Sequence, residues 1–329
     1  MDSSAARKCT NIYSDRSKKR QHKRWKKNQI LKQMTSDHEL HIEKIIGEKS
    51  TSIIEEARLS YHLDSQDISS TEWFENNCKA REATKHVTNI GTDSLLSFHN
   101  EKSLPRLFKF AEEEYLLPPH STFHLCDIKH IEILKGKKFD LIVLDPPWEN
   151  KSVRRNKKYS TLSCESLLDL PIEDLCSPGC LIVLWVTNNE AQMNFITKVL
   201  FNKWKVSNFT GWHWLKVTQK GRVIHPIDWH HKKPYENLLL IRIPFNDNQS
   251  SSTSFLEPEP HKIIVSVPSS IHSHKPPLDE ILKPYISENP NCLELFARYL
   301  LPGWTSLGNE VLKLQNTRLF ERQTSNDDV

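Results

Sequence analysis

Short apolar segments alternate with longer segments of mixed polarity from about residue 104 onward. Each apolar segment is apolar at nearly every position and is bounded by Gly, Pro or Asp, which is typical of strands buried on both faces of a sheet. The segments between them, such as Asn188–Phe201 and Leu278–Tyr285, have the apolar spacing of helices. Strands and helices in alternation predict an α/β domain with a mostly parallel sheet. The predicted strands are Phe123–Leu125, Phe139–Leu144, Cys180–Val186, Leu238–Ile243, Ile263–Val267 and, more weakly, Trp304–Leu307.

The composition divides the chain into regions of different character. Helix-like stretches at Leu40–Ile46 and Ile53–Leu63 stand in a polar, acidic-leaning segment that comes before the α/β pattern. We therefore predict a basic, disordered arm (1–37), an accessory helical region (38–103), the α/β domain (104–318) and a disordered tail (319–329).

The basic residues are concentrated in the arm. Between Arg7 and Lys32 the sequence carries eleven Lys and Arg residues and a single acid, Asp15, although the whole chain has a net charge of only +4. A block of like charge repels itself and binds polyanions, so we interpret it as a nuclear localisation signal and a phosphate-binding arm. The alternative is a solubilising tail. We expect a nuclear protein, with a cytoplasmic pool as a second location.

The pattern argues against several classes of protein. The longest apolar stretch, Cys180–Val186, has the length of a strand, so no membrane span is predicted, and the N-terminus lacks the apolar core of a secretory signal. The seven cysteines are odd in number and irregularly spaced, which indicates reduced thiols in an intracellular protein. Cys176 and Cys180 have no second pair, and the histidines of residues 225–231 have only Asp228 nearby, so no metal site is expected.

The sharpest motif is the tetrapeptide Asp145-Pro146-Pro147-Trp148, which directly follows the predicted strand Phe139–Leu144. In open α/β sheets ligands bind at the carboxyl ends of the strands, so these four residues are the candidate catalytic residues. The Asp145 carboxylate and the Pro146 carbonyl can accept hydrogen bonds from the exocyclic amine of a base, while the prolines hold that carbonyl rigidly. Trp148 offers a flat face to the base. The alternative is a structural Pro-Pro turn at the end of a strand.

The tetrapeptide and the segments around it resemble the MT-A70 family of adenine N6-methyltransferases. The resemblance extends roughly from Phe123 to Leu314 and implies a Rossmann-like α/β fold with a permuted segment order, because the tetrapeptide precedes the cofactor segment. No GxGxxG motif is available among the eight glycines, so a dinucleotide-binding protein is a poor alternative. The matching segments are Cys126–Ile128, Tyr159–Leu162, Leu184–Val186, Ser273–Pro276, Glu294–Arg298 and Leu307–Glu310.

The same resemblance implies S-adenosylmethionine (SAM) as the cofactor. Lys275 would meet the SAM carboxylate, although a lysine on a loop is ordinarily solvated, and Glu294 with Arg298 could instead pair on a helix surface. The chain continues after Arg298 with Tyr299–Pro302, where members of the family place polar cofactor contacts. The residues assigned to SAM are Cys126, Asp127 and Ile128 beside its adenine, Asp145 and Lys275 at its amino-acid end, and Glu294, Arg298, Asn309 and Glu310 at its ribose.

Basic and aromatic residues are the candidates for binding the acceptor. Residues 151–158 carry five basic side chains beside the tetrapeptide, where phosphates would run; a solvated loop is the alternative. Aromatic and basic residues alternate again at Trp212–Lys216 and Trp229–Lys233, which suits stacking on unpaired bases, unless Trp212 or Trp214 belongs to the core. The assigned residues are Lys151, Arg154, Arg155, Lys157, Lys158, Tyr159, Trp214, Lys216 and His231.

The expected function is methyl transfer from SAM to the N6 amine of adenosine in RNA. Lys232–Glu236 and the context of Tyr159 are closest to a branch of the family that acts on 2′-O-methyladenosine of U2 small nuclear RNA, which forms m6Am. DNA adenine is the alternative acceptor, because phosphate contacts do not separate RNA from DNA, and cytosine N4 is disfavoured by the resemblance. A non-catalytic RNA-binding subunit is the second alternative, against which Asp145 and Trp148 are both intact. We expect a monomer.

Overall fold

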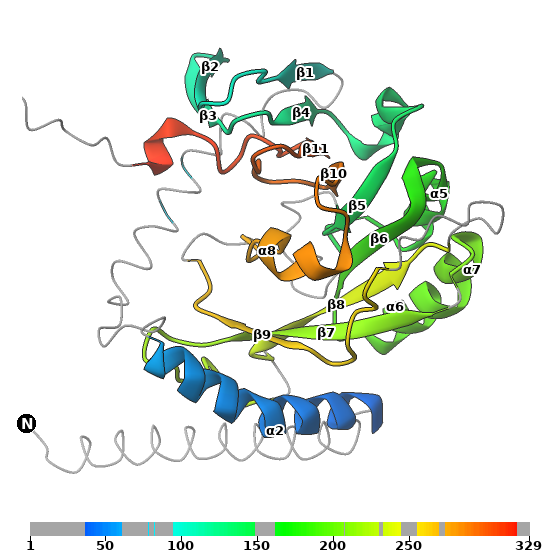
Figure 1. Cartoon of the computed structure of the whole chain (residues 1–329), viewed down its shortest axis with the longest axis vertical. Helices are drawn as coiled ribbons and strands as arrows, with labels where there is room; N and C mark the ends of the chain where they lie inside the picture. The colour runs from blue at the N-terminus through cyan, green and yellow to red at the C-terminus, as the bar shows by residue number, and fades with distance from the viewer. Residues whose placement is uncertain are drawn as a thin grey trace, which may run out of the picture.

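The computed structural model describes residues 37–60, 78, 82, 95–148, 162–206, 208–229, 233–244, 255–269 and 274–320. In these residues a nine-stranded sheet has the strand order β1-β4-β11-β10-β5-β6-β8-β7-β9, and a two-stranded sheet, β2-β3, lies beside β1 (Figure 1). The strands are β1 (Leu96–His99), β2 (Arg106–Phe110), β3 (Glu113–Leu117), β4 (Thr122–Leu125), β5 (Phe139–Leu144), β6 (Cys176–Val186), β7 (Phe209–Lys216), β8 (Tyr235–Arg242), β9 (Ile263–Ser266), β10 (Cys292–Leu295) and β11 (Thr305–Gly308). The α-helices are α2 (Asp37–Leu59), α5 (Ile172–Leu175), α6 (Glu190–Phe195), α7 (Phe201–Lys203) and α8 (Asp279–Leu282). The other helices are η1 (Ile128–Leu134), η2 (Glu165–Asp169), the π-helical η3 (Ile196–Leu200), η4 (Lys283–Tyr285) and η5 (Thr317–Leu319).

The sheet is mostly parallel, as predicted. β4, β11, β10, β5 and β6 run in one direction, and β7 runs parallel to β9, whereas β1 and β8 run antiparallel to their neighbours. In a Rossmann sheet of order 3-2-1-4-5-6 the first strand of the chain lies in the middle of the sheet. Here the last two, β10 and β11, lie between β4 and β5, which confirms the permuted order.

The central strands are buried on both faces. Along β6, Ile182 and Leu184 pack into the apolar layer that includes residues of η1, η2 and η3, while Val183 and Trp185 pack into the layer that includes α8. Alternate residues of a strand point to opposite faces, so a strand covered on both sides is apolar throughout. This burial explains the continuous apolar runs from which the strands were predicted.

The predicted elements are present, and further strands join them. The six predicted strands correspond to β4, β5, β6, β8, β9 and β11, and the two helical segments to α6 through α7 and to α8 with η4. β1, β2 and β3 were not predicted because they lack continuous apolar runs, and β2 is largely exposed. β1 pairs with β4, so Leu96–His99 belongs to the nine-stranded sheet although it lies before residue 104.

The accessory region contributes a helix to the core. The two predicted helical stretches form the single helix α2, which ends at Leu59. Its Ile42, Ile46 and Ile54 pack with Leu215 of β7 and Tyr235 of β8 in one buried cluster. Helix α2 is therefore packed against the sheet through this cluster. In the part of the chain that the structure describes, no helix is both long and apolar enough to cross a membrane.

Candidate active site

The cofactor candidates and the tetrapeptide meet at one edge of the sheet. Asp145 follows β5, Arg298 follows β10, Asn309 follows β11 and Asp127 follows β4. These strands are parallel neighbours, so their carboxyl ends share an edge. The chain leads from β10 to β11 on one side and from β5 to β6 on the other, so the β10–β5 boundary is the topological switch point at which open α/β sheets bind ligands.

Asp145 is held between two cations. Asp145 is only 7% exposed. Its Oδ1 lies 3.2 Å from Lys275 Nζ, and Arg298 Nη1 donates to Oδ2 over 2.7 Å. The three residues come from the ends of β5 and β10 and from the segment before α8. Each carboxylate oxygen has more than one lone-pair direction, so both can still accept another hydrogen bond. The clamp therefore fixes the orientation of Asp145 and leaves it able to receive an amine.

On the β8 side the charge network continues through Glu236. Lys275 Nζ lies 3.0 Å from Glu236 Oε2, and Lys216 of β7 pairs with the other oxygen of the same carboxylate. Burial opposes ionisation of Glu236, but Lys275 and Lys216 outweigh it and lower the pKa of this carboxyl to about 2. The sequence prediction missed Glu236 as a site residue, although an acid at the start of the apolar strand Leu238–Ile243 was a signal for it.

On the β11 side the network continues through Glu310. Arg298 Nε lies 3.5 Å from Glu310 Oε2, and Lys313 Nζ lies 2.9 Å from Oε1. Asn309, the residue before it, is exposed at the same edge. Positive and negative groups thus alternate from Lys216 to Lys313, with Asp145 in the middle of the series.

Glu294 is a buried acid in β10 with an unsatisfied oxygen. Its Oε2 has no hydrogen-bond partner. Burial and the nearby Asp145 raise the pKa of Glu294 to about 8, against the opposing charges of Arg298 and Lys275. Glu294 therefore carries a proton at neutral pH. It lies on a strand, which rules out the alternative that it pairs with Arg298 on a helix surface.

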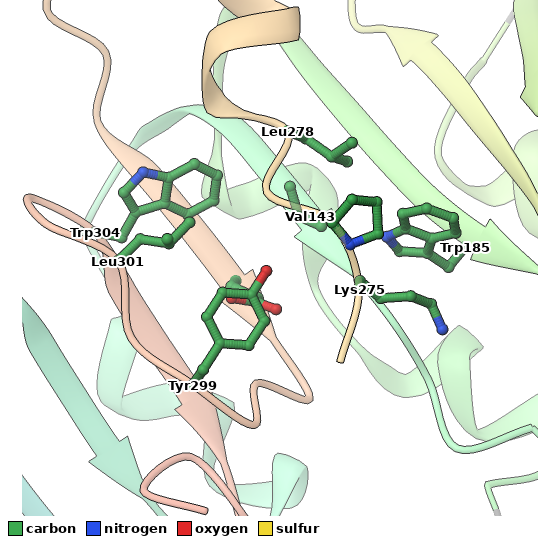
Figure 2. Close-up of a pocket in the computed structure, with 9 residues that line it drawn as sticks. Val143, Trp185, Lys275, Leu278, Tyr299, Leu301 and Trp304 are labelled. Atoms are coloured by element: carbon green, nitrogen blue, oxygen red, sulfur yellow. The ribbon is translucent and has the colours of Figure 1, made fainter. Parts of the chain in front are cut away.

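A small pocket opens beside Glu294. Its volume is about 10 Å³, the size that holds one water molecule. Figure 2 shows Trp304, Leu301 and Tyr299 on one side and Leu278, Trp185 and Lys275 on the other. The segment after Arg298 thus supplies Tyr299 and Leu301 to the wall of this pocket.

The tetrapeptide is anchored by its tryptophan. Trp148 is 8% exposed and belongs to the apolar core, and its indole N–H donates to the carbonyl of Trp185 over 2.8 Å. The main-chain N–H of Trp148 donates to the Pro146 carbonyl over 2.8 Å, which leaves that carbonyl a second lone pair. Core residues cover the ring of Trp148, so the structure does not show the open stacking face that was predicted for it.

Trp214 is likewise a core residue. It is 3% exposed, packs edge-on against Trp185 at 5.9 Å between ring centroids, and donates its indole N–H to Ser266 Oγ. Lys216 Nζ lies 4.6 Å from the centroid of the Trp214 ring. Trp214 thus forms the floor beneath Lys216 and Glu236 and has no open face for a base, which corrects its assignment as a stacking residue. Lys216 lies at the site edge beside Glu236, and its role in binding the acceptor stays a prediction.

The remaining candidates fall into two groups. Cys126 is buried at the end of β4, and Asp127 accepts a hydrogen bond from the Lys129 N–H over 3.0 Å and so caps η1, which Ile128 begins. Among the described residues no three His, Cys, Asp or Glu side chains are grouped to hold a metal ion. Lys151, Arg154, Arg155, Lys157, Lys158, Tyr159, His231 and the basic arm lie outside the described residues and stay predictions.

The sequence profile of the MT-A70 family matches residues 139–310, just over half of the chain, and this range contains the tetrapeptide, Glu236, Lys275, Glu294 and Arg298. This chain belongs to the MT-A70 family. The match begins at β5 and ends just after β11, so it covers the permuted order of strands on both sides of the switch point.

Individual MT-A70 relatives support the assignment. The chain is 46% identical over 226 residues to the human N(6)-adenine-specific methyltransferase METTL4, covering 67% of this chain and 48% of the relative. It is 32% identical over 288 residues to a Caenorhabditis elegans DNA N6-methyl methyltransferase, covering 77% and 75%. It is 34% identical over 213 residues to the N6-methyladenosine RNA methyltransferase MTA1 of Pyricularia oryzae, covering 61% and 55%. The resemblance to the MT-A70 family seen in the sequence is thus confirmed, although the chain spans about half the length of the human relative.

Proposed function

We propose that this chain is a SAM-dependent methyltransferase that acts on the N6 amine of adenosine in RNA, with 2′-O-methyladenosine of U2 small nuclear RNA as the acceptor. The observation that carries the proposal is the position of Asp145. It stands at the carboxyl end of β5, beside the topological switch point, and is followed by two prolines that fix the next carbonyl. The carboxylate and the Pro146 carbonyl are suited to orient an exocyclic amine.

The residues at the edge fit SAM. Glu294 Oε2 is a buried oxygen without a partner, which suits a hydroxyl donor such as a ribose. Lys275 and Arg298 are mostly buried cations that can receive a carboxylate, and Asp145 between them can receive an ammonium group. SAM, when bound, supplies a methyl group made electrophilic by its sulfonium. The protein's part is then to hold the acceptor amine in line with that methyl group and to exclude water.

The relatives' names and the sequence support the choice of acceptor and the nuclear location. The relatives' names include both RNA and DNA, so DNA adenine is the second candidate. RNA is favoured by the fungal relative's name and by the likeness of Lys232–Glu236 to the branch that acts on small nuclear RNA. The basic arm supports a nuclear location and a phosphate-binding role. We propose that the chain acts as a monomer.

The test compares acceptors and an Asp145 variant. Purified protein is incubated with labelled SAM and matched adenine-containing RNA, RNA with 2′-O-methyladenosine, and single-stranded DNA; the products are digested and the nucleosides identified by mass. We expect N6-methyl transfer to the 2′-O-methylated RNA, and a loss of at least about 100-fold in kcat for Asp145→Asn. Exposed Glu280→Gln is the control and should match the wild type.

Each outcome decides a different point. Transfer to DNA in preference to both RNAs would replace RNA by the second candidate. Full activity in Asp145→Asn, with its fold checked by circular dichroism, would refute the role given to the carboxylate. SAM binding without transfer to any of the three acceptors would favour a non-catalytic subunit.

A further inference from the structure

The connection between β7 and β8 borders the active-site edge. It leaves β7 after Lys216 and returns at Lys233, so its two ends stand beside Lys216 and Glu236, the pair that holds Lys275. Its first part is a hairpin in which Val217 bridges Val223 and the Thr218 N–H donates to the Arg222 carbonyl over 2.7 Å. The placement of this connection therefore bears directly on Glu236.

Helix α2 holds the returning end. Lys233 is only 9% exposed; its Nζ lies 2.9 Å from Glu39 Oε1 and also contacts Glu43 Oε1, one turn along the helix. Burial acts against the charge, but these two carboxylates raise the pKa of Lys233. A buried ammonium between two carboxylates is fixed in place, because leaving the pair would strand a charge in the interior.

Lys233, which Glu39 and Glu43 hold, stands three positions before Glu236, the acid that faces the site. Tyr235 packs in the same buried cluster as the apolar face of α2, whereas Glu236 reaches Lys275 and Lys216. Successive side chains of a strand point to opposite faces, so α2 fixes one face of β8 at the point where the other face carries Glu236. The Lys216 N–H also donates to the Pro234 carbonyl over 2.8 Å, which ties β7 to the same segment.

The opposite end of α2 holds the hairpin. Arg58 Nη2 donates to the Lys220 carbonyl over 2.8 Å and approaches the Gly221 carbonyl at 3.5 Å. Helix α2 thus contacts the β7–β8 connection at two places. Arg58 binds the tip of the hairpin, and Glu39 and Glu43 bind Lys233 just before β8. Both anchors join segments that are far apart in the sequence.

We propose that α2 is a positioning element for the acceptor side of the site, which fixes the β7–β8 connection and Glu236 through the Lys233 clamp and the Arg58 anchor. The kinetic consequence of this proposal rests on the proposed function, whereas its structural consequence does not. Lys275 also keeps Asp145 as a partner, and α2 packs on the β7–β9 side of the sheet, away from β10 and β11. Loss of the anchors should therefore impair acceptor use more than SAM binding.

The test uses three variants and a control on the same helix. E39Q/E43Q removes the carboxylates of the clamp, E39Q/E43Q/K233Q removes it without leaving an unpaired buried charge, and R58A removes the hairpin anchor. The control K44Q/E48Q alters an exposed ion pair of α2, with side chains 73% and 64% exposed. Full-length chains are compared by hydrogen exchange, calorimetric SAM binding and kinetics with the acceptor RNA.

We expect amides of residues 217–229 and 233–236 to exchange about tenfold faster in the clamp variants and those of 217–223 in R58A, while β5, β10 and β11 keep their protection. The kcat/KM for RNA should fall about tenfold or more, with the Kd for SAM within about twofold and the control unchanged. Unchanged exchange, or faster exchange spread evenly over the sheet, would overturn the proposal. A wild-type chain that transfers no methyl group would refute the proposed function, while the exchange result would still decide the role of α2.

Discussion

Replacing Glu294 by Gln should change how stability depends on pH. The pKa of this carboxyl is raised from 4.5 to about 8 by burial and by Asp145. Because the folded-state pKa is the higher one, the folded protein keeps a proton that the unfolded chain has released between pH 4.5 and about 8. Glu294 therefore does not alter the free energy of unfolding below pH 4.5, where both states hold the proton. The free energy of unfolding falls as the pH rises from 4.5 to about 8.

The magnitude follows from the same shift. Each pH unit inside this window changes the free energy of unfolding by about 1.4 kcal/mol. Relative to its value below pH 4.5, the free energy of unfolding is therefore lower by about 1 kcal/mol at pH 5, about 3 kcal/mol at pH 7 and about 4 kcal/mol at pH 8. The amide of Glu294→Gln has nearly the same shape and does not titrate. Its stability relative to the wild type should therefore rise by about 3 kcal/mol between pH 5 and pH 8.

Urea unfolding at pH 5, 6, 7 and 8 measures this difference. Any fixed cost of the buried amide is the same at every pH, and other titrating groups are present in both proteins, so both cancel from the pH-dependent part of the comparison. Exposed Glu48→Gln serves as the control and should run parallel to the wild type. If Glu294→Gln also runs parallel, Glu294 is not protonated in the folded protein and the account of its burial is wrong.

Three further outcomes are expected. Gly308→Ala should lower the unfolding free energy by about 2 kcal/mol in urea titrations, because its Cβ would lie 2.8 Å from the Ala297 carbonyl oxygen, whereas Gly47→Ala, with open space in α2, should raise it by about 0.5 to 1 kcal/mol; equal effects would contradict the packing at β11. Lys275→Met should weaken SAM binding in calorimetry by about 2 kcal/mol, or roughly 30-fold, and an unchanged Kd would remove Lys275 from the cofactor site. Deleting residues 1–34 should weaken RNA binding and flatten its salt dependence in filter-binding assays, and an unchanged slope would leave the arm a solubilising tail.

The local hydrophobic pattern was enough to predict the strands that are buried on both faces. β5 and β6 are apolar at nearly every position because both of their faces are covered, so Phe139–Leu144 and most of Cys176–Val186 were recognisable without their neighbours. The tetrapeptide then follows at the carboxyl end of β5, where open α/β sheets bind ligands. Fold class, family and the central carboxylate could therefore be predicted.

Local pattern failed where a strand carries a polar residue whose partner lies far along the chain. β7 was missed because His213 interrupts its apolar run; its Nδ1 meets Asn237 Oδ1 at 2.7 Å on β8. β10 was missed because Glu294 interrupts it, and that acid is tolerated when it holds a proton. Neither residue looks like an interior residue until its environment is known.

What the sequence by itself determined is six of the strands, the mostly parallel arrangement of the sheet and the tetrapeptide at the end of β5. Only the tertiary structure decided that Lys275 and Arg298 clamp Asp145, that Glu236 joins them, that the rings of Trp148 and Trp214 are covered, and that α2 packs on the sheet. The physical reason is that periodicity reports the environment of one segment at a time. Which charges meet depends on which strands become neighbours, and Asp145 and Arg298 meet across 153 positions of the chain.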